Sequence, residues 1–153
     1  MNSNVLFLLD EPARSSAMRL SSLFGNTDYK QSKVYTFTDL SETTIKDLCR
    51  EEKCEWVVAM RSAATAMLHI QGYKKILISP VVTPTDVEDV TSSDADNTWG
   101  FFGGSSEEEA SYEVFQCKYP NAVWYLGREH LQLENICKEV CEIIINSCNK
   151  ELI

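Results

Sequence analysis

The stretch Val57-Val58-Ala59-Met60-Arg61-Ser62-Ala63-Ala64 decides the fold, because an apolar strand pattern changes there to an alanine-rich helical pattern. The apolar run 56–59 predicts a buried strand, and residues 63–71 predict the helix that follows it. A second apolar run, 75–79, predicts a further strand. Strand, helix and strand in this order form a βαβ unit, in which the two strands are parallel.

A tight turn joins the strand to the helix at the centre of this stretch. In hydrolases of the α/β class the equivalent turn carries G-x-S-x-G, with small residues on both sides of the serine so that strand and helix approach closely. Here Ala59 and Ala63 are the small pair, and they bracket Arg61. With Ser62 at the apex, Met60 would have to fit where the turn is most crowded. The spacing therefore favours Arg61, although an ordinary strand-loop-helix with a surface arginine fits it as well.

Apolar runs and helical patterns alternate along the whole chain. The alternation predicts a three-layer α/β/α fold, in which helices cover both faces of a mostly parallel, roughly six-stranded sheet. The longest expected loop is 80–97, and since no linker divides the chain, residues 1–153 are expected to form one domain. The expected strands are 4–9, 33–37, 56–59, 75–79, 98–102 and 122–126, and the expected helices are 13–24, 41–52, 63–71, 107–119 and 133–149.

The composition predicts a soluble, cytoplasmic protein. Of the 153 residues, 44% are apolar and 24% are charged, and no apolar run approaches the ~20 residues that a membrane helix needs. The N-terminus lacks a basic region, and its apolar run 5–9 is shorter than the core of a signal peptide. A cytoplasmic location is therefore expected by default.

The six cysteines are expected to be reduced thiols that hold no metal, and no cofactor is expected. They are Cys49, Cys54, Cys117, Cys137, Cys141 and Cys148. None forms a C-x-x-C, and no paired histidines stand at zinc-site spacing. The last three recur at i, i+4 and i+11 on an expected helix, which is the spacing of a buried stripe where cysteine acts as a small hydrophobe.

The net charge of -9 is concentrated in one segment. Residues 81–110 hold eight acids and no Lys or Arg, namely Asp86, Glu88, Asp89, Asp94, Asp96, Glu107, Glu108 and Glu109. Such a field repels phosphate backbones and anionic lipid, so nucleic acid and membranes are poor partners. A solvated loop is favoured over an acidic docking surface for this segment.

Five stretches, 6–10, 57–64, 72–80, 99–106 and 125–131, carry motifs in the order of a known family. The most specific is Gly72-Tyr73-Lys74-Lys75-Ile76-Leu77-Ile78-Ser79-Pro80, which matches a family pattern G-Y-x-K-I-L-x-N-P. The chain thereby resembles the YqiA/YcfP-like small esterases of the α/β-hydrolase superfamily over nearly its whole length. This resemblance implies a minimal α/β-hydrolase fold, and it places Arg61 on the family's catalytic serine.

The same resemblance implies altered residues at the other catalytic positions. A His-Gly that helps shape the family's oxyanion pocket falls on Leu9-Asp10, where a carboxylate would repel a developing oxyanion. The family's acid falls on Ser106, with Glu107 to Glu109 nearby. The family's histidine falls on Glu129, and His130 lies one residue away.

Arginine at the serine position changes the chemistry of the site. Acyl transfer in this class needs a serine hydroxyl, a neutral imidazole and a carboxylate, whereas the guanidinium of Arg61 stays protonated at any biological pH. An arginine at a helix N-terminus also meets the positive end of the dipole, at a penalty of ~0.3 to 1 kcal/mol unless it is compensated. We therefore predict that Arg61 and Glu129 form an ion pair where serine and histidine meet in active relatives.

Three functions are consistent with these residues. The favoured one is a pseudoenzyme that binds a small molecule or a protein without turnover, in a crevice formed by Leu9, Asp10, Met60, Arg61, Ser62 and His130. The second is an active carboxylic-ester hydrolase with Ser62 as nucleophile, His130 as base and Glu107, Glu108 or Glu109 as orienting acid. The third is a protein-interaction module that uses the acidic segment 86–96.

Overall fold

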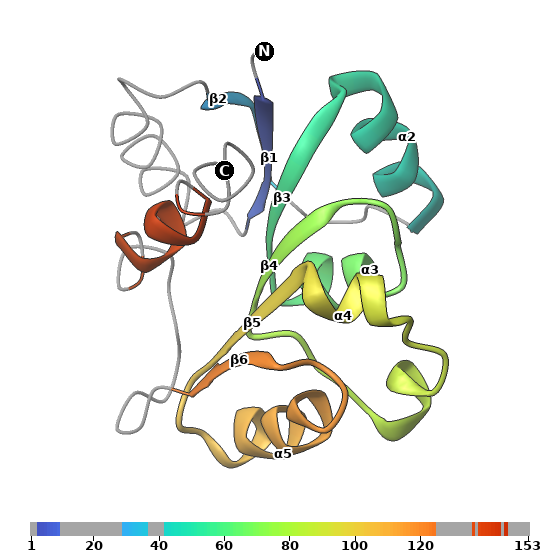
Figure 1. The fold of residues 1–153 in the computed structure, drawn as a ribbon, viewed down its shortest axis with the longest axis vertical. Coiled ribbons are helices and arrows are strands. Elements are labelled where there is room, and N and C mark those ends of the chain that lie inside the picture. Colours follow the sequence, from blue (N-terminus) through green and yellow to red (C-terminus); the bar gives the residue numbers. More distant parts are fainter. Residues whose placement is uncertain are drawn as a thin grey trace.

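The computed structural model describes residues 3–9, 29–36, 42–124, 136, 138–144 and 146. Six strands form one sheet in the order β2-β1-β3-β4-β5-β6, and every neighbouring pair is parallel (Figure 1). The strands are β1 (Ser3–Leu9), β2 (Tyr29–Thr36), β3 (Cys54–Met60), β4 (Lys74–Ile78), β5 (Thr98–Phe102) and β6 (Asn121–Trp124). The expected parallel α/β sheet is confirmed.

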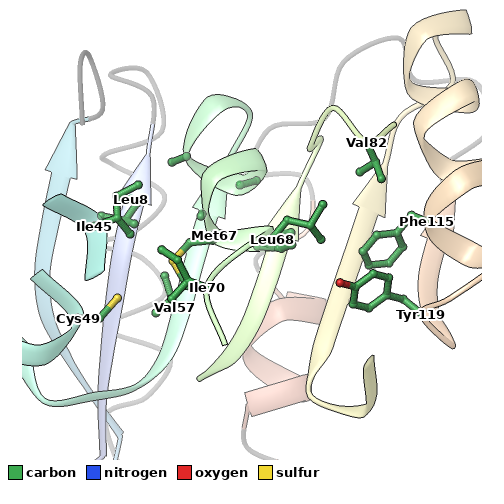
Figure 2. Close-up of a cluster of buried hydrophobic side chains, with 14 of the residues drawn as sticks. Leu8, Ile45, Cys49, Val57, Met67, Leu68, Ile70, Val82, Phe115 and Tyr119 are labelled. Atoms are coloured by element: carbon green, nitrogen blue, oxygen red, sulfur yellow. The ribbon is translucent and has the colours of Figure 1, made fainter. Parts of the chain in front are cut away.

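Helices lie on both sides of this sheet, so the fold has the expected three layers. One side carries α2 (Glu42–Glu52), α3 (Ser62–Leu68), α4 (Ser92–Asp96) and α5 (Ser106–Gln116), and the helical residues 138–144 lie on the other (Figure 1). Alternate strand residues serve the two cores, since successive side chains on a strand point to opposite faces. The core under α2, α3 and α5 contains Leu6, Leu8, Val57, Ala59, Leu77 and Phe102, and the opposite core contains Val5, Phe7, Val58, Met60, Ile76 and Ile78. Figure 2 shows Leu8 and Val57 in the first of these cores.

Several boundaries differ from the expected ones by a few residues. Strand β2 begins at Tyr29 instead of residue 33, and α3 ends at Leu68 instead of residue 71. Only part of the expected helix 133–149 is described, and its described residues are helical. The expected helix 13–24 lies outside the described residues.

The expected loop 80–97 contains two short helices, the 3-10 helix η2 (Pro84–Val87) and α4. Thr83 begins η2 in a capping box, in which Asp86 Oδ2 accepts hydrogen bonds from the Thr83 N–H at 2.8 Å and the Thr83 hydroxyl at 2.9 Å. Thr91 caps α4 by accepting a hydrogen bond from the backbone three residues on. The prediction of one long loop was wrong, because its threonines and aspartates satisfy the first N–H groups of helices.

A charged pair is buried in the core beneath α3 and α4. Lys75 is fully buried, and its Nζ lies 2.9 Å from Asp94 Oδ1 and 3.2 Å from Oδ2. The same ammonium donates to the carbonyl oxygens of Met67 at 3.3 Å and Ile70 at 2.9 Å. Burial lowers the pKa of Lys75, while the hydrogen bond and charge of Asp94 oppose that shift. The pair ties α4 to β4 and to the end of α3.

Tyr119 lies beside this pair. The contribution of Tyr119 to the free energy of unfolding is expected to decrease above about pH 10. Burial, followed by the charge of Asp94, raises the pKa of its phenol. The folded state therefore keeps a proton that the unfolded chain loses above about pH 10, so the free energy of unfolding falls as the pH rises from there. In urea titrations at rising alkaline pH, the stability difference between wild type and Tyr119→Phe should shrink. A difference that stays constant across this range would contradict the assignment.

The described cysteines are free thiols. Cys49, Cys54 and Cys141 are buried, and Cys117 is exposed. Cys141 packs with Val140 against the sheet, in agreement with the expected buried stripe. Cys137 and Cys148 lie outside the described residues.

None of the helices in the described part of the chain combines the length and apolar character needed to cross a lipid bilayer.

Candidate functional site

The turn between β3 and α3 has an unusual backbone at Arg61, with φ 50 and ψ -115. Residues with a bulky side chain seldom adopt positive φ, and such positions cluster at functional sites. Ala59 and Ala63 on either side are fully buried, so the strand and the helix approach closely. The turn thus has the strand-turn-helix shape of a nucleophile elbow, and the residue with positive φ is Arg61 and not Ser62.

Relief of this backbone strain should be measurable. The variant Arg61→Gly is expected to raise the free energy of unfolding by about 1 kcal/mol, because glycine adopts positive φ without a steric penalty. The matched control is Ser62→Gly, one residue along and inside α3, which should instead lower it by up to about 1 kcal/mol. Urea unfolding of both variants tests the pair. Equal destabilisation by both would show that the contacts of the Arg61 side chain outweigh the strain.

Backbone hydrogen bonds continue beyond the ends of the strands and align the residues that follow them. The Arg61 N–H donates to the Ile78 carbonyl at 2.8 Å, and the Ser79 N–H donates to the Phe101 carbonyl at 2.8 Å. Ser79 also has positive φ, at 54°. Because the carboxyl ends of parallel strands meet at one edge of the sheet, Arg61, Ser79 and the loop after β5 lie side by side.

A crevice of about 790 Å³ lies at this edge. Its wall combines an arginine, hydroxyl groups and two carboxylates with an apolar strip formed by residues 80–82. Its volume is in the range of small-molecule sites. The lining residues are Arg61, Ser62, Thr65, Ser79, Pro80, Val81, Val82, Ser105, Glu107, Glu108, Ala110 and Ser111.

Glu108 fixes one side of the crevice. Its Oε1 accepts hydrogen bonds from the Ser79 hydroxyl and from the Gly103 N–H, the latter at 2.9 Å. Its own N–H donates to Ser105 Oγ at 3.2 Å, which caps α5. The Glu108 carboxylate therefore joins the end of β4 to the loop before α5, and its oxygen is already engaged in structural hydrogen bonds.

Thr65 and Ser111 hold the segment 80–82 that forms the apolar strip. Thr65 Oγ1 accepts a hydrogen bond from the Val81 N–H at 2.9 Å, and Ser111 Oγ accepts one from the Val82 N–H at 3.1 Å. Val81 remains 65% exposed. The backbone of this segment is thus anchored to α3 and α5 while the Val81 side chain is available for contact.

The structure brings together part of the crevice expected from sequence. Arg61, Ser62 and Glu107 line it. Met60 does not, because it is fully buried in the core on the opposite face of the sheet. The expected acid position, Ser106, is an exposed residue in the first turn of α5, and its neighbour Ser105 lines the crevice instead.

One of the remaining expected site residues is placed by the structure, and three are not. Leu9 ends β1, whereas Asp10, Glu129 and His130 lie outside the described residues. The ion pair between Arg61 and Glu129 therefore stays a prediction.

Sequence reasoning missed Thr65, Ser79 and the apolar strip. Ser79 could have been found by aligning the apolar runs of β3 and β4. Met60 pairs with Ile78, so the residues that follow them, Arg61 and Ser79, reach the same edge of the sheet. The positive φ of a serine has no such signal in the sequence.

Three of the eight acids in 81–110 are used within the fold. Asp94 pairs with Lys75 and Glu108 binds Ser79, while Asp86 Oδ1 lies 2.9 Å from His69 Nε2. Burial alone would raise the pKa of Asp86, but hydrogen bonds from Thr83 and His69 hold it below its ordinary value. The exposed acids that remain are Glu88, Asp89, Asp96, Glu107 and Glu109, a weaker docking surface than the sequence alone suggests.

Within the described ranges, no three His, Cys, Asp or Glu side chains cluster as metal ligands would.

Comparisons with known proteins show the fold. No family model and no curated protein sequence matches this chain. Among solved structures, the esterase Pf2001 of Pyrococcus furiosus is similar at a TM-score of 0.56 and 10% identity, over 95% of this chain and 83% of that one. A second crystal form of the same esterase gives a TM-score of 0.55 and 10% identity, over 94% and 81%. The chain therefore has an α/β-hydrolase-like fold.

Proposed function

We propose that this chain is a divergent, cytoplasmic member of the YqiA/YcfP-like esterase family that binds a small molecule in the crevice without hydrolysing it. The observation that carries the proposal is the positive φ of Arg61 at the turn where an esterase of this fold presents its serine. The solved esterase structures support this comparison at the level of the fold.

The side chains around the apex lack an obvious substitute for the nucleophile. A guanidinium donates hydrogen bonds but has no lone pair with which to attack an ester carbonyl. The Ser79 hydroxyl already donates to Glu108. Ser62 is exposed and lines the crevice, but it lies in the first turn of α3, one residue past the apex. Its hydroxyl is therefore the competing candidate next to the apex.

The lining of the crevice favours an amphipathic ligand. Arg61, Ser62 and Ser79 provide polar groups at the ends of β3 and β4, while Val81 and Val82 provide apolar contacts. A ligand with a carboxylate head and a short hydrocarbon chain would satisfy both parts, because the guanidinium of Arg61 and the hydroxyl of Ser62 can bind a carboxylate through charge-assisted hydrogen bonds.

Catalysis is tested with short-chain p-nitrophenyl esters and a fluorophosphonate probe. We expect neither turnover above buffer nor covalent labelling of the wild-type protein, with esterase Pf2001 as the active reference. If the protein turns over esters, and both Ser62→Ala and His130→Ala abolish the activity, the chain is a hydrolase that uses these two residues. That result would overturn the proposal.

Binding is tested by titration calorimetry with octanoate as the probe. The variant Ala110→Trp places an indole at the crevice wall and should weaken binding by about tenfold or more, a change of about 1.4 kcal/mol. The control, Ser106→Trp, introduces the same side chain at an exposed site outside the crevice lining and should leave the affinity unchanged. Equal effects of the two variants would show that octanoate binds elsewhere.

A further inference from the structure

Two buried cysteines face each other across the turn between α2 and β3, far along the strand from the crevice. Cys49 lies on α2 and is 1% exposed, and Cys54 is the first residue of β3 and is 8% exposed. The Cys54 thiol donates a hydrogen bond to the Cys49 carbonyl at 3.7 Å. Figure 2 shows the Cys49 side chain extending from α2 toward the sheet. The two thiols are therefore close in the folded chain as well as in sequence.

The turn between them is short and sharply bent. Lys53 has a positive φ of 50°, and its N–H donates to the Arg50 carbonyl at 3.3 Å. This backbone folds the start of β3 back against the last turns of α2. The turn thus keeps the two thiols together without a covalent link.

A second cavity gives access to Cys54. It has a volume of about 530 Å³ and lies at the amino ends of β3 and β4, where its lining includes Cys54, Glu55, Tyr73 and Lys74. The crevice lies at the carboxyl ends of the same strands, so the two cavities occupy opposite edges of the sheet. Water and small solutes can reach the neighbourhood of Cys54 through this cavity.

The surroundings favour an ionised sulfur at Cys49. A hydrogen bond from the Cys54 side chain lowers the pKa of the Cys49 thiol and outweighs the opposing effect of burial. Burial and then the charges of the two cysteines raise the pKa of Tyr73, so its phenol stays protonated beside them. Since the thiolate is the reactive form of cysteine, this environment differs from that of an inert core cysteine.

We propose that Cys49 and Cys54 form a redox modification site, in which a hydroperoxide converts the two thiols to an intramolecular disulfide. Cys54, at the cavity, passes its thiol proton to the Cys49 thiolate and attacks the peroxide as the thiolate; the O–O bond breaks, and the hydroxide that leaves takes up this proton from Cys49 as water. The Cys54 sulfenic acid that remains is attacked by the Cys49 thiolate. The S–O bond breaks, the second hydroxide leaves and takes up a proton from solvent as water, and the S–S bond forms. Two thiols are oxidised while one hydrogen peroxide is reduced to two waters.

The sequence provides a direct readout of this bond. Trypsin cuts after Lys46, Arg50, Lys53 and Arg61, so Cys49 and Cys54 fall in separate peptides, 47–50 and 54–61. The native, full-length protein is treated with hydrogen peroxide, unfolded in urea that contains N-ethylmaleimide to block the remaining thiols, digested without reductant and analysed by mass spectrometry. We expect the two peptides to appear as one disulfide-linked species that separates on reduction, and both cysteines to carry maleimide in the untreated protein.

Matched variants identify the reacting pair. Cys49→Ser and Cys54→Ser should each abolish the linked species, whereas Cys117→Ser, which removes an exposed thiol just past the end of α5, should leave its yield unchanged. The proposal is overturned if, in the wild-type protein, Cys117 is oxidised while Cys49 and Cys54 both remain available to maleimide. A linked species that joins either cysteine to Cys117 instead would also overturn it. The wild-type measurement decides the matter even if a serine variant fails to fold.

Discussion

Replacing Asp94 with alanine is expected to lower the free energy of unfolding by about 3 to 5 kcal/mol, because it leaves the ammonium of Lys75 buried without its carboxylate. Lys75 is fully buried and Asp94 is 7% exposed, so water cannot readily replace the lost partner. The carbonyl oxygens of Met67 and Ile70 still accept hydrogen bonds from Nζ, but they carry no net charge. Urea unfolding at neutral pH measures the effect.

Two further variants separate the charge effect from a general effect on α4. Asp96→Ala lies on the same helix at an exposed position, and it should change stability by no more than about 0.5 kcal/mol. The double variant Lys75→Met with Asp94→Leu removes both charges and should recover most of the loss, since a buried ion pair can often be replaced by apolar residues. Equal losses in Asp94→Ala and Asp96→Ala would contradict the buried-pair explanation.

The loss caused by Asp94→Ala should also depend on pH. Burial already lowers the pKa of Lys75, and removal of Asp94 takes away the interactions that raise it. A lysine whose pKa is lower in the folded state makes the protein more stable as the pH rises toward the unfolded value of about 10.4, because the unfolded chain then binds more protons. The variant should therefore be less impaired at about pH 10 than at pH 7, whereas a loss due only to packing would not change in this way.

Gly100→Ala is expected to cost about 1 to 3 kcal/mol, because strand β5 packs directly against an aromatic cluster. A Cβ at this position would lie 2.6 Å from Cε1 of Phe115 and 2.9 Å from Cε2 of Phe102. Phe115 is fully buried and stacks on Tyr119 with a centroid distance of 4.2 Å. Its ring therefore has little room to retreat. Thermal or urea unfolding of the single variant tests the prediction.

A double-mutant cycle identifies the clash as the cause. Phe115→Leu removes the ring atoms nearest to the added Cβ, so Gly100→Ala should cost less in that background than in the wild type. Strictly additive losses would show that the cost comes from a source other than contact with Phe115.

The layer structure could be predicted from the sequence because each strand repeats apolar residues that pack on two helical layers. The short helices within 80–97 could not, because Thr83 and Asp86 look the same in a solvated loop and in a capping box. The buried pair of Lys75 with Asp94 was missed for a related reason. A lysine at the start of an apolar run is ordinarily exposed, and only the position of α4 places a carboxylate beside it.

The candidate site likewise has parts that could be predicted from the sequence and parts that could not. The small pair Ala59 and Ala63 points to Arg61 as the residue at the apex, and Arg61 has the positive φ. The link from Ser79 to Glu108 depends on strand register and on a left-handed serine, and neither is encoded in a short motif. Local spacing therefore predicts the turn, whereas the wall of the crevice depends on the assembled sheet.

The hydrogen bonds that Arg61 and Ser79 donate to neighbouring strands come from their main-chain N–H groups. Every residue other than proline carries the same N–H donor, so these bonds can persist when the side chains change, at a cost set by the positive φ of both positions. On such a scaffold, single substitutions can change the chemical groups that the rim displays. A designer could therefore vary the side chains at positions 61 and 79 while keeping the main-chain bonds that shape the rim.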